Sequence, residues 1–161
     1  MKKYKWIFIL VNLIILLNLV TNSIFKKEKL LSNGQLILLE LAPVDPRSLM
    51  QGDYMNLRYA ISNNDTDSIS KRGFCIVKLD TVGVAKKVRI QDDKTPLHED
   101  EFLINYTLKQ WRGINIGAES YFFQEGEGKK YEAAKYGGLK IDANGNSLLI
   151  GLYDENRQQI K

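Results

Sequence analysis

A long, uncharged and mainly apolar run near the N terminus most constrains how this chain can fold. Residues 6–25 carry no charged side chain, and Leu, Ile and Val dominate them. About 20 such residues are needed for a helix to cross the hydrocarbon core of a bilayer. A cleaved signal peptide is the alternative, but the run is long for that role and no Ala-x-Ala site follows it. The sequence therefore predicts an uncleaved transmembrane anchor over residues 6–25, in contact with a lipid bilayer.

Lysines flank the predicted anchor on both sides. Three of the 23 Lys and Arg residues lie in a short head at residues 1–5, and three more lie in a predicted juxtamembrane linker at residues 26–33. Because the two flanks are equally basic, the charge rule barely decides the orientation. A short head before a long domain is typical of a signal anchor. We therefore expect one span, a cytoplasmic N terminus and a domain on the other side of the membrane.

Three asparagines, Asn12, Asn18 and Asn22, interrupt the apolar run. Asn18 and Asn22 are four residues apart and share one face of a helix. Side-chain amides in that position can bond a neighbouring helix, at about 0.6–2 kcal/mol each. In the other interpretation, Asn22 already lies at the membrane interface and Asn18 bonds its own backbone. Contacts of Asn18 and Asn22 with a partner helix are thus one of two open predictions.

Composition and isolated motifs argue against several classes of function. The net charge is +4, but no run of Lys and Arg interleaved with aromatic residues follows the anchor, so nucleic-acid binding is not expected. Cys75 is the only cysteine, which excludes an internal disulfide and a cysteine-based zinc site. The only histidine, His98, lacks the second histidine of a zinc-binding motif. The Gly-rich segment at 126–130 lacks the hydroxyl of a phosphate-binding loop. We predict no metal, cofactor or catalytic residue.

Residues 34–161 have the pattern of a compact, mainly β domain with a minor α component. A turn is expected at residues 32–34, and Asn144-Gly145 is the strongest hairpin signal in the chain. One short helix is expected at residues 129–136, between the late strands, with Gly137-Gly138 as its stop. Alternating apolar residues and turn signals predict strands at 35–42, 53–59, 74–79, 84–90, 102–108, 120–123, 139–142 and 147–153.

The segment Gly52–Tyr59 combines a turn signal with a strand. Gly52 allows a tight turn, and Asp53 can accept backbone N–H bonds within it. Alternation along a strand places Leu57 and Tyr59 on one face, where a role in the core explains them. Tyr54 points to the opposite face. It is therefore the residue of this segment that folding explains least, and we expect it to face another element, a ligand or a partner.

These residues carry a resemblance to a known family. Gly52, Asp53, Tyr54, Leu57 and Tyr59 match every fixed position of the motif that names the GDYXXLXY family of bacterial membrane-anchored proteins. The later order of aromatic strand, Glu-Gly turn, Tyr-Glu-Ala-Ala-Lys-Tyr-Gly helix and closing hairpin also resembles that family. The resemblance implies a location in the bacterial cytoplasmic membrane and an uncharacterised function. It also implies a multi-pass membrane protein as a partner, because members are often encoded beside such proteins.

Two hypotheses for the function follow. In the first, the chain is a non-enzymatic, extracytoplasmic binding or assembly subunit of a membrane complex. The candidate partner or ligand surface is then formed by Tyr54, Glu125, Gly126 and Tyr131. In the second, the domain is a hydrolase or a ligand-binding domain with a cleft near Asp53, Tyr54 and the turn at Glu125. A multi-pass partner would support the first hypothesis, and a ligand bound in that cleft would support the second.

The second hypothesis has a specific weakness. An anchor, a Pro-containing stretch and a Gly-Asp turn resemble the layout of type I signal peptidases. In that family a serine lies eight residues before the glycine, but here that position is Val44, and Ser48 lies only four residues before Gly52. A general base needs a nucleophile to activate, so the lysines at 78, 86 and 87 have no catalytic partner. The likeness is therefore one of layout alone.

Overall fold

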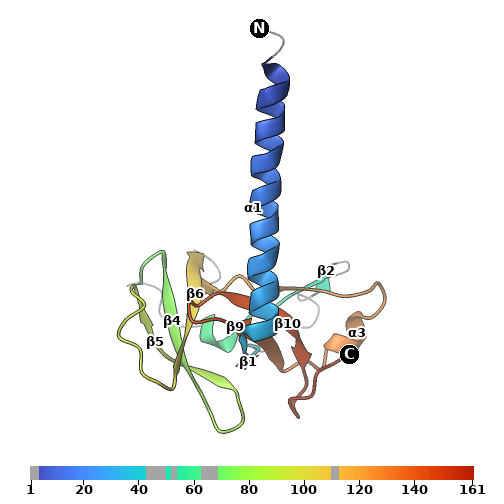
Figure 1. The fold of residues 1–161 in the computed structure, drawn as a ribbon. Helices are drawn as coiled ribbons and strands as arrows, with labels where there is room; N and C mark the ends of the chain where they lie inside the picture. Colours follow the sequence, from blue (N-terminus) through green and yellow to red (C-terminus); the bar gives the residue numbers. More distant parts are fainter. Residues whose placement is uncertain (1–3, 43–49, 52–53, 63–68, 110–112) are drawn as a thin grey trace.

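A single helix, α1 (Lys5–Asn33), projects from a β-rich domain in the computed structural model of the chain (Figure 1). The structure describes residues 4–42, 50–51, 54–62, 69–109 and 113–161. At 1.5 Å per residue, the 29 residues of α1 form a helix about 43 Å long. The helix includes the predicted anchor and continues through residues 26–33, where the sequence predicts a linker. Lys, Glu and Leu favour helix in that segment, which explains the continuation.

The C-terminal end of α1 is docked on the domain. The turn predicted at residues 32–34 is the end of the helix itself, where the Gly34 N–H donates to the Leu30 carbonyl at 2.9 Å. Leu30 is the buried residue of α1, with 7% of its surface exposed. The Lys140 Nζ donates to the Gly34 carbonyl at 2.8 Å. A side chain at position 34 would meet the carbonyls of Leu30 and Ile141. Glycine is therefore needed here because the backbones of α1 and β9 approach this position too closely for a side chain.

The remainder of the chain is mainly β, as predicted, and among all described residues, α1 included, strand makes up 41% against 26% helix. The elements after α1 are β1 (Gln35–Glu40), β2 (Met50–Gln51), β3 (Tyr54–Asn56), the 3-10 helix η1 (Ala60–Ser62), β4 (Arg72–Leu79), β5 (Ala85–Gln91), β6 (Glu101–Lys109), β7 (Gly113–Asn115), β8 (Ser120–Phe122), α3 (Gly128–Tyr131), β9 (Tyr136–Ile141) and β10 (Ser147–Tyr153). Each predicted strand overlaps one of these strands.

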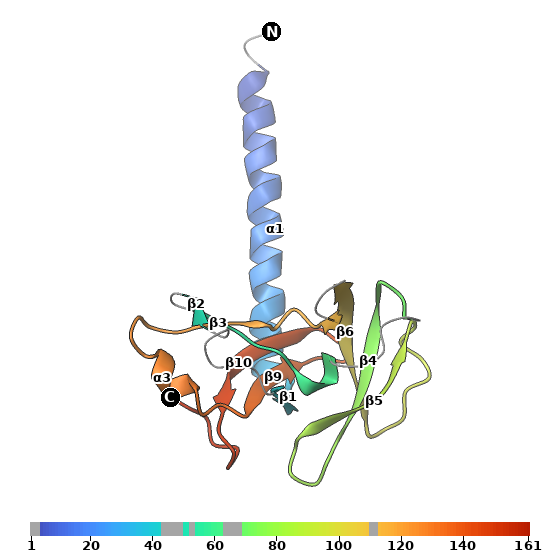
Figure 2. The ribbon, with the colours of Figure 1, turned by 180° about the vertical axis from the view of Figure 1, so that it is seen from behind.

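The strands form three antiparallel sheets, ordered β1-β9-β10, β2-β3-β8 and β5-β4-β6-β7. The first sheet continues directly from α1, and α1 contacts its strands β9 and β10. Figures 1 and 2, seen from opposite sides, place β2 and β3 level with the last turns of α1. The turn between β4 and β5 lies at the far end of the domain. The β2-β3-β8 sheet is therefore on the side from which the helix projects.

One hydrophobic core joins the three sheets. Its members include Leu39 of β1, Met55 of β3, Cys75 of β4 and Ile104 of β6, each at most 1% exposed. On the opposite face of β1, Leu38 forms a second, smaller cluster with Val84 and Tyr153. Both faces of β1 are therefore covered around Leu38. Leu36, near the start of the strand, is 39% exposed.

The predicted helix at residues 129–136 is only four residues long, α3 (Gly128–Tyr131), and Tyr136 already belongs to β9. Gly137 and Gly138 lie inside this strand and not at the end of a helix. A Cβ at Gly137 would be 2.9 Å from Tyr59 Cε1, and one at Gly138 would collide with the Tyr153 ring. The two glycines therefore leave room for the Tyr59 and Tyr153 rings to pack against opposite faces of the strand.

The hairpin predicted at Asn144-Gly145 is confirmed, and a second hairpin joins β4 and β5. At the β9-β10 turn, the Asp142 Oδ1 accepts the backbone N–H groups of Asn144 and Asn146, each at 2.9 Å. Gly145 has φ of 83°, which is why glycine suits the position. Asp80 makes the same kind of turn between β4 and β5. In both turns the aspartate carboxylate accepts hydrogen bonds from backbone N–H groups of the loop.

Candidate functional site

The described residues of the segment Gly52–Tyr59 begin at Tyr54, and they form β3, the inner strand of the β2-β3-β8 sheet, and the chain that follows it. Gly52 and Asp53 lie outside the described residues, so their turn remains a prediction. From Met55 the predicted alternation is observed: Met55, Leu57 and Tyr59 are 1%, 6% and 0% exposed. The strand is shorter than predicted: β3 ends at Asn56, and Tyr59 makes only an isolated antiparallel bridge with Leu41.

Tyr59 connects three parts of the domain. Its hydroxyl donates to the Ala118 carbonyl at 2.6 Å, and its ring lies against Gly137 in β9. Burial raises the pKa of the Tyr59 hydroxyl, and the nearby Glu119 carboxylate raises it further. The hydroxyl therefore stays protonated and acts as a donor. This arrangement is structural and gives Tyr59 no route to a substrate.

The hollow beside this segment is too small for a ligand. It is lined by Leu41, Ala42, Met55, Leu57, Arg58, Tyr131 and Ala134, and its volume is about 20 Å³. A cavity of that size holds about one water molecule, whereas pockets for small molecules measure about 300–1,000 Å³. This hollow is therefore not a cleft of the size that the ligand-binding hypothesis requires.

Tyr54 and Phe122 form an aromatic pair on the outer face of the β3-β8 ladder. The two residues lie directly opposite each other, with ring centroids 5.7 Å apart and ring planes inclined by 37°. Their neighbours Met55 and Tyr121 point to the core side, so the pair points away from it. Tyr54 is half-buried and Phe122 is 74% exposed. An exposed aromatic pair of this kind is a candidate contact surface.

The other three residues of the predicted surface have different environments. Glu125 is exposed, and Gly126, with φ of 86°, is exposed in the turn after β8. Tyr131 is 6% exposed, and its ring makes an edge contact with Tyr121 at a centroid distance of 5.1 Å. Tyr131 is therefore a core residue and not part of an exposed surface, because α3 turns its ring beneath β8. Phe122 takes its place as the exposed aromatic.

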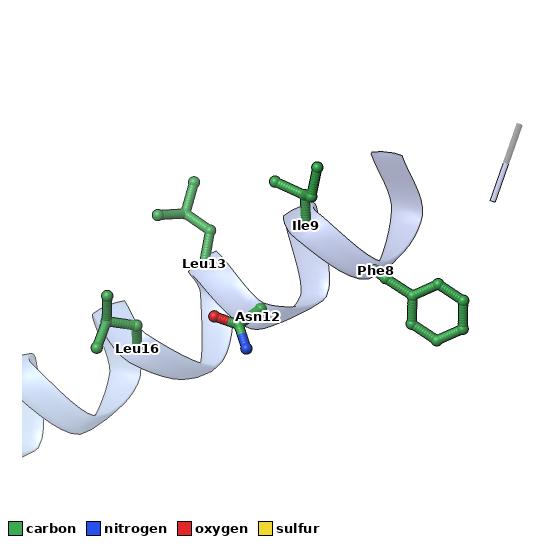
Figure 3. A pocket seen from close by; sticks show the side chains of 5 residues that line it. All are labelled: Phe8, Ile9, Asn12, Leu13 and Leu16. Atoms are coloured by element: carbon green, nitrogen blue, oxygen red, sulfur yellow. The ribbon is translucent and has the colours of Figure 1, made fainter. Parts of the chain in front are cut away.

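The apolar part of α1 is long and apolar enough to cross a membrane, and the rest of the chain buries none of it. The Asn18 Nδ2 donates to the Ile14 carbonyl at 2.9 Å, so Asn18 bonds its own backbone. Asn12 lies in a shallow groove lined also by Phe8, Ile9, Leu13 and Leu16 (Figure 3). Asn12 and Asn22 make no side-chain hydrogen bond within the described part of the chain.

Titratable side chains elsewhere are arranged as structural groups. Burial raises the pKa of the Cys75 thiol to about 12, so this thiol stays protonated. Lys78 pairs with Asp100, and Lys86 pairs with Glu40 at 3.2 Å. Among the residues that the structure describes, no group of three or more His, Cys, Asp or Glu side chains could hold a metal ion.

Comparison with known proteins gives one match, which covers most of the chain. A family model described as GDYXXLXY protein matches residues 16–152, from the middle of α1 almost to the end of β10. The matched region includes the motif, all three sheets and the junction between α1 and β1. No curated protein and no solved structure matches the chain.

Proposed function

The chain belongs to the GDYXXLXY family, and we propose that it is a single-pass protein of the bacterial cytoplasmic membrane that serves as a binding or assembly subunit of a membrane complex. In this proposal α1 is an uncleaved signal anchor, the N terminus is cytoplasmic and the β-rich domain lies on the extracytoplasmic side. The family is of unknown function, so membership assigns no chemistry.

The exposed apolar surface of α1 carries the proposal. Trp6, Phe8 and Leu19 are 76%, 74% and 63% exposed, and the apolar side chains between them are similarly uncovered. Soluble proteins rarely expose a continuous apolar surface of this size. The residues from Trp6 to Phe25 would rise about 29 Å as a helix, which matches the roughly 30 Å hydrocarbon core. A bilayer is the environment in which this surface is stable.

A partner helix would account for Asn12 and Asn22 of α1. Asn12 and Asn22 are ten residues apart, so with Ile15 and Leu19 they follow the a and d spacing of a heptad seam. Helices that cross at about 20° in membranes meet along such a seam. Asn12 lies about 5 Å from the middle of the span, where lipid offers no hydrogen-bond partner. An amide or hydroxyl of a neighbouring helix would satisfy it.

The enzymatic alternative has no comparable support. The hollow beside the motif has room for about one water molecule, and the sequence has Val44 where a signal peptidase would have its serine. Of the lysines at 78, 86 and 87, Lys78 is paired with Asp100 and Lys86 with Glu40. We therefore propose a binding or assembly role and no reaction.

Site-specific photo-crosslinking in cells tests the partner. A photoreactive residue replaces Leu19 on the seam or, as a control, Leu17, which lies nearly opposite on the helix and is similarly exposed. We expect a stoichiometric adduct with a multi-pass protein from position 19 and none from position 17. Asn12→Leu should lower recovery of this adduct by about 3- to 30-fold, from the 0.6–2 kcal/mol of one interhelical hydrogen bond. Equal adducts at both positions, or a monomer throughout, would contradict the proposal.

A further inference from the structure

We infer that the outer face of the β3-β8 ladder rests on the bilayer surface, with Tyr54 and Phe122 at the level of the lipid headgroups. The inference rests on the proposed function in one respect, that α1 spans the membrane. It adds a second membrane contact, made by the folded domain, and it assigns lipid as the partner of the exposed aromatic pair.

The length of α1 places the domain close to the membrane. If residues from Trp6 to Phe25 fill the hydrocarbon core, only the eight residues from Lys26 to Asn33 separate that core from β1. They rise about 12 Å, and the headgroup layer on one side of a bilayer is about 5–8 Å thick. The β2-β3-β8 sheet is closer still, because Figures 1 and 2 show β2 and β3 level with the last turns of α1 and not beyond its end. This sheet therefore reaches the headgroup layer.

The junction between helix and domain maintains this placement. There is no flexible linker, because α1 passes into β1 through Gly34 alone. Leu30 is buried against the domain, and the Gly34 carbonyl accepts a hydrogen bond from the Lys140 Nζ. Chain segments far apart in the sequence thus hold the end of the helix. The domain cannot swing away from the bilayer without breaking these contacts.

The chemistry of the outer face suits a lipid interface. Phe122 keeps 74% of its surface exposed although its strand neighbour Tyr121 packs in the core, so folding alone does not account for its position. The Tyr54 ring packs on Phe122 at a centroid distance of 5.7 Å. Aromatic residues concentrate at membrane interfaces, where an apolar ring and a polar hydroxyl are both accommodated. The exposed Lys26 and Lys27 directly follow the predicted span on α1 and favour anionic headgroups, although Glu28 offsets part of this charge.

Fluorescence quenching of the full-length chain tests the contact. The chain is reconstituted in vesicles of phosphatidylcholine and phosphatidylglycerol in equal amounts, with and without lipids that carry a nitroxide on the headgroup. A fluorophore is attached at Ser120→Cys, an exposed position two residues before Phe122 on the same face, or at Val82→Cys in the β4-β5 turn at the far end of the domain. The native Cys75 is buried and stays unlabelled. We expect several-fold stronger quenching at position 120 than at position 82, and Phe122→Ser should reduce the quenching at position 120.

A third labelled position distinguishes failure of this membrane contact from failure of the transmembrane anchor on which the inference rests. At Leu16→Cys, in the middle of the apolar run, a nitroxide on the acyl chain should quench the fluorophore strongly. Quenching at position 16 together with equal, weak quenching at positions 120 and 82 would overturn the contact and leave the anchor standing. An unquenched label at position 16 would overturn both.

Discussion

Replacement of Tyr59 by phenylalanine tests how the motif supports the fold. The change removes one hydroxyl oxygen and leaves the ring in place. That oxygen is buried and donates to the Ala118 carbonyl at 2.6 Å, across the boundary between the motif segment and the chain that leads into β8. Loss of the donor leaves a buried carbonyl without this partner. Such a loss costs about 1–3 kcal/mol of unfolding free energy.

The chain offers a matched control. Tyr136 is half-buried, and its hydroxyl makes no hydrogen bond within the described residues. Tyr136→Phe should therefore change the unfolding free energy by no more than about 0.5 kcal/mol.

A second variant, Gly137→Ala, tests the position of the Tyr59 ring. Its new methyl group would lie 2.9 Å from Tyr59 Cε1, and overpacking of this kind costs about 1–3 kcal/mol.

Urea unfolding of the full-length chain in a mild detergent gives the measurement. Near-ultraviolet circular dichroism follows the packing of the aromatic residues of the domain. With a urea dependence of about 2 kcal/mol per molar, a loss of 1–3 kcal/mol lowers the midpoint by about 0.5–1.5 M. Equal midpoints for Tyr59→Phe and Tyr136→Phe would refute the conclusion that the Tyr59 hydroxyl stabilises the domain.

Two further variants test other contacts. The Arg89 guanidinium donates to Glu101 Oε1 and Oε2 at 2.5 and 2.8 Å and lowers the pKa of the Glu101 carboxyl to about 2 from 4.5. Because the folded-state pKa is the lower one, this pair stabilises the domain above about pH 4.5 and its contribution is lost as the pH falls toward 2. Glu101→Gln should flatten the fall in urea midpoint over this range, and an unchanged slope would contradict the pairing. Gly138→Ala should lower the midpoint by at least about 0.5 M, because its methyl group collides with the Tyr153 ring, and wild-type stability would contradict that packing.

Local patterns were sufficient to predict much of the fold. The apolar run predicts the helix, and Asn144-Gly145 predicts the closing hairpin, since each signal acts within a few residues. Alternation also predicts that Leu57 and Tyr59 are buried and that Tyr54 faces away from them. These inferences need only the period of a strand and the position of one turn.

The predictions that the structure contradicts concern residues whose environment depends on side chains far away in the sequence. A Gly-Gly pair after a helical pattern indicates a helix stop, but Gly137 and Gly138 accommodate Tyr59 and Tyr153, whose positions the local sequence does not reveal. Tyr131 follows an exposed turn, yet packing against β8 buries it.

The same limit applies to the candidate contacts. The exposure of Phe122 depends on which face of β8 meets the core, and the docking of Leu30 depends on β9 and β10. The heptad spacing that links Asn12 to Asn22 is visible in the sequence, but so is the spacing of four residues that links Asn18 to Asn22. Only the structure shows that Asn18 bonds its own backbone.

The most direct test of the central claim is protease protection in cells whose outer barrier has been opened. If α1 anchors the chain with its domain on the extracytoplasmic side, added protease should digest the domain and leave a membrane-embedded fragment that contains α1, while a cytoplasmic marker protein stays intact. A domain that resists digestion until detergent dissolves the membrane would contradict the proposed topology. Recovery of the intact chain in the soluble fraction would contradict the anchor itself.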